Sequence, residues 1–229
     1  PSVALGMLLV AACPGGAMSN FMTHLARGNT ELSVALTAAT TTAALVTTPL
    51  NLAFWAGLHP DAAPLLRSVA LDPQDMLRTI GIVIAAPLAL GMLIAGKLPR
   101  LAAPLRRPLR ILSMVVFAVM LVIAVRSNLA ASLDHLPVIF GVVLLHNALA
   151  FATGWLAATA ARLDPRDRRA ITIEVGIQNA GLALLITVDF FSGLGGMALI
   201  AACWGVWHLI AGFALVGAWR LRDRQAARA

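Results

Sequence analysis

Long apolar runs separated by short charged connections are the feature of this chain that most restricts its fold. Each run is about 20 residues long, which is the length that one helix needs to cross the hydrocarbon core of a membrane. The runs cover residues 2–26, 32–54, 76–96, 109–125, 136–161, 170–188 and 194–219. With 60% hydrophobic and 12% charged residues, the chain is too apolar for a soluble domain of its length. We therefore predict an all-α polytopic membrane protein with seven spans.

The basic residues of the connections predict how the spans are oriented. When the connections are assigned to alternate sides of the membrane, 14 of the 17 lysine and arginine residues fall on one side. Only Arg67, Arg78 and Arg126 fall on the other side. Because connections rich in lysine and arginine stay in the cytoplasm, we expect the C-terminus to be cytoplasmic. The basic residues are scattered and have no aromatic residues among them, so nucleic acid is not an expected partner.

The first run is interrupted near its middle by the stretch "CPGGAMSN", residues 13–20. Pro14 has no N–H group, and the two glycines after it favour a non-helical backbone. We expect one helix to stop near Cys13 and the next to begin near Ala17. Inside a membrane such a break persists only where protein or water satisfies the freed backbone groups. A simple proline kink is the alternative, but the polar pair Ser19 and Asn20 favours a functional break.

Glu174 is the only carboxylate inside any of the seven runs. Placing a lone acid at membrane depth costs at least about 2.5–3.5 kcal/mol, so this residue needs a specific reason to be there. A functional site is one reason, and an ion pair with Arg168 or Arg169 near the end of the span is the other.

The segment around Glu174 is similar to the first break. Aligning Asn20 with Asn179 places "GAMSN" against "VGIQN". The two segments cross the membrane in opposite directions and are five spans apart. This arrangement predicts an inverted repeat of five helices (5+5), whose two breaks meet near the midplane.

Polar side chains from three runs predict a cation site. Ser33 and Thr37 lie one helical turn apart, and the short "ARGNTE" turn folds their helix back against the first break. Five side chains could then form an oxygen cage for Na⁺: Ser19, Asn20, Ser33, Thr37 and Glu174. We expect the threonines of residues 40–48 to donate to their own i−4 carbonyls, and His146 and Asn147 to serve packing. His208 could be a packing residue or part of a site.

Three stretches of the chain closely resemble the bile acid:sodium symporter family, and its bacterial members in particular. They are "CPGGAMSNFMTHLARGNTELSVALT" at residues 13–37, "TPL" after it and "EVGIQNAGLAL" downstream. The resemblance implies a ten-helix inverted-repeat transporter fold with two crossed discontinuous helices. This chain, which begins at Pro1, would be N-terminally truncated and would run from the fourth helix to the tenth. Residues 1–58 and 135–222 would belong to a core domain, and residues 75–130 to a panel domain.

The resemblance also implies which residues bind ions and substrate. One Na⁺ site would use the five side chains already named. A second would use Glu174 again with Val175, Ile177 and Gln178, and with a glutamine from an upstream helix, so it would be incomplete in this chain. Substrate contacts would involve Ala17, Asn179 and His208, although Ala17 is a hydroxyl residue in some members.

We therefore predict a sodium-coupled symporter that carries an organic anion, bile-acid-like or a smaller carboxylate, across the bacterial inner membrane by alternating access. One alternative is a proton-coupled or sodium-independent carrier in which Glu174 takes up the proton. Another is a fragment that does not transport by itself. An intramembrane enzyme is not expected, because the sequence has no paired aspartates, Ser-His pair, HExxH motif or aspartate-rich motif.

Overall fold

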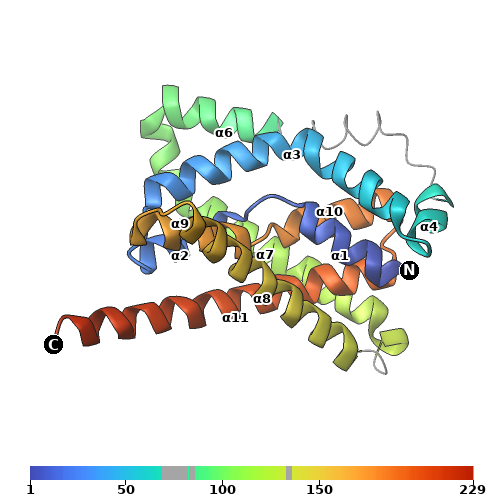
Figure 1. The fold of residues 1–229 in the computed structure, drawn as a ribbon. Coiled ribbons are helices and arrows are strands. Elements are labelled where there is room, and N and C mark those ends of the chain that lie inside the picture. Colours follow the sequence, from blue (N-terminus) through green and yellow to red (C-terminus); the bar gives the residue numbers. More distant parts are fainter. Residues whose placement is uncertain (69–81, 83–85, 133–135, 229) are drawn as a thin grey trace.

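A computed structural model of the chain describes residues 1–68, 82, 86–132 and 136–228 (Figure 1). The helices within these residues are α1 Ser2–Ala12, α2 Ala17–Leu25, α3 Thr30–Leu58, α4 Ala62–Ser68, α6 Ala86–Lys97, α7 Pro99–Ser132, α8 Leu136–Ala160, α9 Pro165–Gly176, α10 Ala180–Phe191 and α11 Gly195–Ala226. The prediction of an all-helical fold is confirmed for the described part of the chain.

The long helices correspond to the predicted spans. Three helices of the described residues, α3, α8 and α11, are long and apolar enough to cross a membrane. Helix α7 covers the predicted span 109–125, while much of the predicted span 76–96 lies outside the described residues. Helix α7 begins at Pro99, before the predicted span 109–125, so most of the basic connection at residues 97–110 is helical. The leucines, alanines and arginines of this segment are strong helix formers.

Two of the predicted spans are interrupted, and their breaks meet. Helix α1 ends at Ala12 and α2 begins at Ala17, as the sequence predicts, while α9 ends at Gly176 and α10 begins at Ala180. The backbone N–H of Gly16 donates to the carbonyl of Ile177 at 2.8 Å, and that of Asn179 donates to Pro14 at 2.9 Å. Each break therefore satisfies backbone groups of the other.

The register of the two breaks differs from the predicted alignment. Gly16 is the N-cap residue of α2, and Asn179 is the N-cap residue of α10. The local structure therefore makes Gly16, and not Asn20, the counterpart of Asn179. The predicted alignment matched the asparagine that both segments contain, Asn20 with Asn179. In the first segment, the helix restarts after Gly16, about one turn before Asn20.

Side chains of the long helices complete the hydrogen bonding where α1 and α9 end. Thr48 of α3 donates from Oγ1 to the Ala12 carbonyl at 2.7 Å, and Asn147 of α8 donates from Nδ2 to the Gly176 carbonyl at 2.8 Å. Both side chains are buried. The expectation of i−4 bonding is confirmed for Thr42, which donates to Ala38, and is wrong for Thr48. Asn147 does more than pack, because it supplies a donor to a helix end.

We expect Thr48→Val to lower the free energy of unfolding by about 1–3 kcal/mol, because it leaves the buried Ala12 carbonyl without its donor. The thermal unfolding midpoint of the purified protein in detergent measures this effect. Thr42→Val is the matched control, since Thr42 is exposed and bonds only to its own helix. Equal destabilisation by the two variants would contradict a capping role for Thr48.

Two apolar clusters pack the half-helices against α11. The first joins α1 and α10 to the N-terminal half of α11 and includes Leu9, Leu184 and Trp204. The second joins α2 and α9 to the C-terminal half of α11 and includes Met22 and Trp219. Helix α11 thus passes both halves of the interrupted pairs and holds the paired breaks between two apolar clusters.

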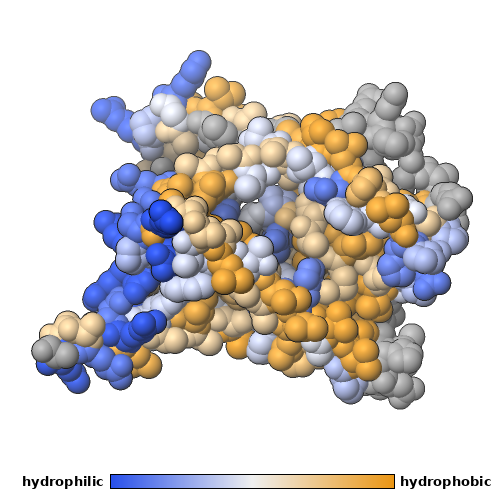
Figure 2. Space-filling view, in the orientation of Figure 1, coloured by the Kyte–Doolittle hydropathy of each residue, from blue (hydrophilic) through white to orange (hydrophobic). Residues whose placement is uncertain are grey.

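The most hydrophilic residues gather at one end of the molecule. In Figure 2 they lie along the left edge, where Figure 1 places the α2–α3 turn, the start of α9 and the end of α11. Apolar surface occupies much of the region between this edge and the opposite end. These three segments are among those that the charge count assigned to the basic side, and the structure places them together at one end (Figure 1).

Candidate functional site

The carboxylate of Glu174 lies in a cluster of side-chain oxygens next to the paired breaks. Ser19 Oγ donates to Glu174 Oε2 at 2.6 Å, and Thr37 Oγ1 lies 2.8 Å from Oε1. Ser33 Oγ is 3.4 Å from Oε2. Glu174 is only 6% exposed, and Ser19 and Ser33 are fully buried. The structure therefore brings together the side chains that the sequence predicted as one cage.

The cluster depends on how three helices are placed. Ser19 lies in the first turn of α2, directly after the break, and Ser33 and Thr37 lie one turn apart on α3. Asn29 caps α3 by accepting from Leu32 N and also donates to Asp167 of α9 at 2.7 Å. The turn between α2 and α3 is thereby fixed against the helix that carries Glu174.

The start of α9 is capped by Asp164 outside the apolar run. Its carboxylate accepts from the backbone N–H groups of Asp167 and Arg166. These hydrogen bonds lower the pKa of the Asp164 carboxyl and so keep it ionised next to the positive end of the helix.

The cluster holds more acceptors than its hydroxyl hydrogens can serve. Thr37 Oγ1 lies 2.8 and 3.0 Å from the two Glu174 oxygens, 2.9 Å from Ser33 O, 3.2 Å from Asn20 Oδ1 and 3.3 Å from Ser19 Oγ. One hydroxyl donates to only one of these acceptors at a time. The cluster is therefore rich in oxygen lone pairs and suits a small cation.

Neither neighbouring arginine pairs with Glu174, so the ion-pair alternative is wrong. Arg168 donates to the Leu163 carbonyl, and Arg169 forms an ion pair with Asp223 of α11. In the ranges that the structure describes, the partners recorded for the Glu174 carboxylate are hydroxyl groups.

Gly15 lies directly against the Glu174 carboxylate, a contact that the sequence analysis missed. A Cβ atom on Gly15 would overlap Glu174 Oε1 and would lie 2.8 Å from Cδ. The sequence analysis interpreted this glycine only as a helix breaker. Its contact with Glu174, a residue far along the chain, could not be predicted from the residues around Gly15.

A cavity of about 270 Å³ adjoins the cluster. It lies between the first break, α3 and α9, and is lined by Ala12, Cys13, Pro14, Gly15, Thr40, Ala43, Ala44, Thr47, Glu174, Val175 and Gln178. Its lining is mostly apolar, with Glu174 at one wall. An organic molecule in this cavity would lie beside the oxygen cluster.

The residues of the predicted second Na⁺ site are close to one another along α9 and the break. The Val175 carbonyl accepts from Gln178 Nε2 at 3.1 Å, and the Ile177 carbonyl accepts from Gly16 N. Gln178 Oε1 is buried, and none of the described residues donates a hydrogen bond to it. Val175, Gln178 and Glu174 all line the cavity, whereas Ile177 takes part in the pairing of the breaks.

The three predicted substrate contacts do not line this cavity. Ala17 is the exposed first residue of α2. Asn179 caps α10, because its Oδ1 accepts from Leu182 N at 3.0 Å. His208 lies on α11 and is 5% exposed.

Comparison with known proteins relates the chain to membrane transporters. A family model described as "Sodium Bile acid symporter family" matches residues 1–134. The "Uncharacterized sodium-dependent transporter YocS" of Bacillus subtilis is 32% identical over 226 residues, which cover 98% of this chain and 67% of that protein.

Eukaryotic relatives are similar over much of the same length. The "Probable sodium/metabolite cotransporter BASS1, chloroplastic" of Oryza sativa is 36% identical over 221 residues, 95% of this chain and 51% of that protein. The human "Sodium/bile acid cotransporter 4" is 31% identical over 187 residues, 80% of this chain and 41% of that protein. The chain thus spans 67% of the length of the bacterial relative and about half of the plant one.

Proposed function

This chain belongs to the sodium bile acid symporter family, and we propose that it forms part of a multi-pass membrane transporter that couples Na⁺ to the uptake of a small organic anion. The names of its relatives, a sodium-dependent transporter, a sodium/metabolite cotransporter and a sodium/bile acid cotransporter, support this proposal. The observation that carries it is the surplus of oxygen acceptors around the buried Glu174 carboxylate.

The chemistry of the cluster fits Na⁺ as the coupled ion. One carboxylate together with hydroxyl and amide oxygens is a set of hard ligands with a single negative charge, which suits a hard monovalent cation. Within the described residues, no group of three His, Cys, Asp or Glu lies together as a transition metal would require. We propose Ser19, Asn20, Ser33, Thr37 and Glu174 as the first Na⁺ site.

A second Na⁺ site is proposed beside the first. It would use Glu174, the backbone oxygens of Val175 and Ile177, and the Gln178 side chain, whose Oε1 is buried and accepts no hydrogen bond from the described residues. A glutamine from a helix upstream of Pro1 would complete it. Na⁺ is a co-substrate here and not a resident cofactor.

The ends of the half-helices support an anionic substrate. Helices α2 and α10 begin at the paired breaks, so the positive ends of their dipoles point there, while α1 and α9 direct their negative ends to the same place. One location thus offers partial charges of both signs. The apolar cavity beside it suits the hydrocarbon part of a bile-acid-like molecule or a smaller carboxylate. Ala17, Asn179 and His208, which do not line this cavity, are proposed as substrate contacts on the ground of the family resemblance alone.

We propose alternating access as the mechanism. Na⁺ bound between α2, α3 and α9 would neutralise Glu174 and hold these helices together. The core would then move against the panel only when it holds both Na⁺ and substrate or neither of them. The core would be residues 1–58 and 135–222, and the panel residues 75–130. A ligand shifts such an equilibrium only through its different affinity for the two states, which the charge of Glu174 would supply. The basic end would face the cytoplasm of a bacterium, with the spans in its inner membrane.

Uptake into proteoliposomes tests the proposed function. We expect an inward Na⁺ gradient to raise uptake of a labelled anionic steroid or small carboxylate about tenfold over an equal K⁺ gradient. Uptake that follows a pH gradient and ignores Na⁺ would instead favour a proton-coupled carrier that uses Glu174. Absence of uptake under the Na⁺, K⁺ and pH gradients would contradict the proposal that this protein transports these anions.

A further inference from the structure

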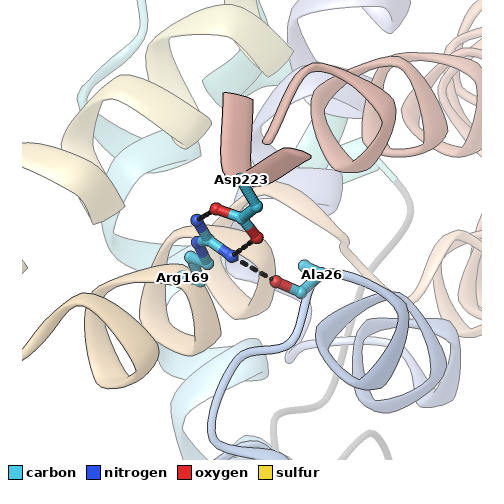
Figure 3. A network of polar contacts seen from close by, with 3 residues as sticks. All are labelled: Ala26, Arg169 and Asp223. Carbon is cyan, nitrogen blue, oxygen red and sulfur yellow. Dashed lines mark hydrogen bonds and ion pairs between the residues drawn. The ribbon is translucent and has the colours of Figure 1, made fainter. Parts of the chain in front are cut away.

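Arg169 joins the ends of three helices at the polar end of the molecule (Figure 3). Its Nη1 donates to the Ala26 carbonyl at 2.7 Å and to Asp223 Oδ2 at 2.8 Å, and its Nη2 donates to Asp223 Oδ1 at 2.6 Å. Arg169 belongs to α9, Ala26 follows α2, and Asp223 belongs to α11. A bidentate pair of this kind is stronger and more directional than a single hydrogen bond.

Two tryptophans support the guanidinium groups around this contact. Arg169 lies over the Trp219 ring at 5.6 Å, and Arg168 lies over Trp155 at 5.2 Å. The two rings stack with their centroids 6.1 Å apart. Such stacking limits the orientations of a guanidinium group, so Arg169 is held ready to bind its partners.

The Ala26 carbonyl, which accepts from Arg169, lies at the C-terminal end of α2. Ala26 is the C-cap of α2, where the helix leaves carbonyls unpaired and carries its partial negative charge. Arg169 therefore binds the end of α2 by charge as well as by a hydrogen bond.

The same two short helices also meet at the oxygen cluster. Helix α2 carries Ser19 two turns before Ala26, and α9 carries Glu174 little more than one turn after Arg169. Between these two contacts, Met22 and Ile173 belong to one buried apolar cluster. The Arg169–Ala26 contact and the Ser19–Glu174 contact thus lie at opposite ends of the same helix pair.

We propose that Arg169 is a positioning residue for the Na⁺ site, which fixes the end of α2 against α9 and α11 so that Ser19 and Asn20 stay within reach of Glu174. This inference rests on the proposed function. Arg169 does not touch the ion. It sets the affinity for Na⁺ from the opposite end of the same helix pair.

The dependence of uptake on Na⁺ concentration tests this role. We expect Arg169→Gln to raise the half-saturating Na⁺ concentration about tenfold, with the maximal rate at saturating Na⁺ within about twofold of the wild type. Asp223→Asn should raise it less, because Arg169 can still bind Ala26. Arg168→Gln is the matched control. It removes the same charge one residue away, from a guanidinium group that donates to the Leu163 carbonyl and not to the end of α2.

Each outcome decides the inference. An unchanged half-saturating Na⁺ concentration in Arg169→Gln, or an equal rise in Arg168→Gln, would overturn it. If Arg169→Gln does not reach the membrane, Asp223→Asn is measured by itself. An unchanged half-saturating Na⁺ concentration in Asp223→Asn would then overturn the inference as well. Wild-type uptake that ignores Na⁺ would instead contradict the proposed function, so the two failures are distinguishable.

Discussion

We expect Glu174→Gln to abolish Na⁺-dependent uptake, with a loss of at least about a hundredfold, while the protein stays folded in the membrane. The amide keeps the size of the side chain and one acceptor oxygen, so Ser19 Oγ retains a partner. What disappears is the negative charge, which is the only one among the five proposed ligands of the first site. In a buried site of low dielectric constant, the attraction of this charge helps to offset the cost of dehydrating the cation, and the amide does not supply it.

Uptake and Na⁺-dependent thermal stabilisation measure this effect independently. The variant should lose both, whereas its unfolding midpoint without Na⁺ should stay close to that of the wild type. Glu31→Gln is the matched control, because it makes the same chemical change at an exposed residue in the first turn of α3. Na⁺-dependent uptake that survives in Glu174→Gln would rule out the proposed site.

We expect Gly15→Ala to remove Na⁺ binding with much less effect on folding. The new methyl group would overlap Glu174 Oε1, so the carboxylate must leave its position between Ser19 and Thr37. The nearest backbone atom, the Glu174 carbonyl oxygen, would be 3.3 Å away, so the main chain needs only a small adjustment. Gly15 also does not have the positive φ that would strain an alanine.

Na⁺-dependent thermal stabilisation and uptake also measure this second effect. Gly57→Ala on α3 is the control, since a Cβ there would meet no described atom within 4 Å apart from its chain neighbours and the backbone of its own helix. Wild-type Na⁺ affinity in Gly15→Ala would mean that the carboxylate can bind the ion from another position. The cluster described here would then not be the binding geometry.

Local chemistry explains what could be predicted from the sequence. Pro14 lacks an N–H group and the two glycines after it favour a non-helical backbone, so the first break was predicted at its observed place. Glu174 was identified as a site residue because a carboxylate at membrane depth is costly, and the short turn after α2 indicated its neighbours. The second break has no proline, and its restart at Asn179 was placed against the wrong residue of the first segment.

Contacts between distant segments could not be predicted in the same way. Thr42 and Thr48 look alike in the sequence, and only the position of α1 beside α3 makes one of them a cap for Ala12. The bond from Asn147 to Gly176 and the pairing of Arg169 with Asp223 likewise depend on which faces of two helices meet. Helical periodicity describes a face but does not identify its partner.

The paired breaks also constrain how the chain can be made. Gly16 N–H and the Pro14 carbonyl find their partners in residues 177–179, which leave the ribosome much later. Until then these groups have no protein partner, and lipid hydrocarbon offers none. The chain can therefore satisfy these two groups by itself only after α9 and α10 have been made.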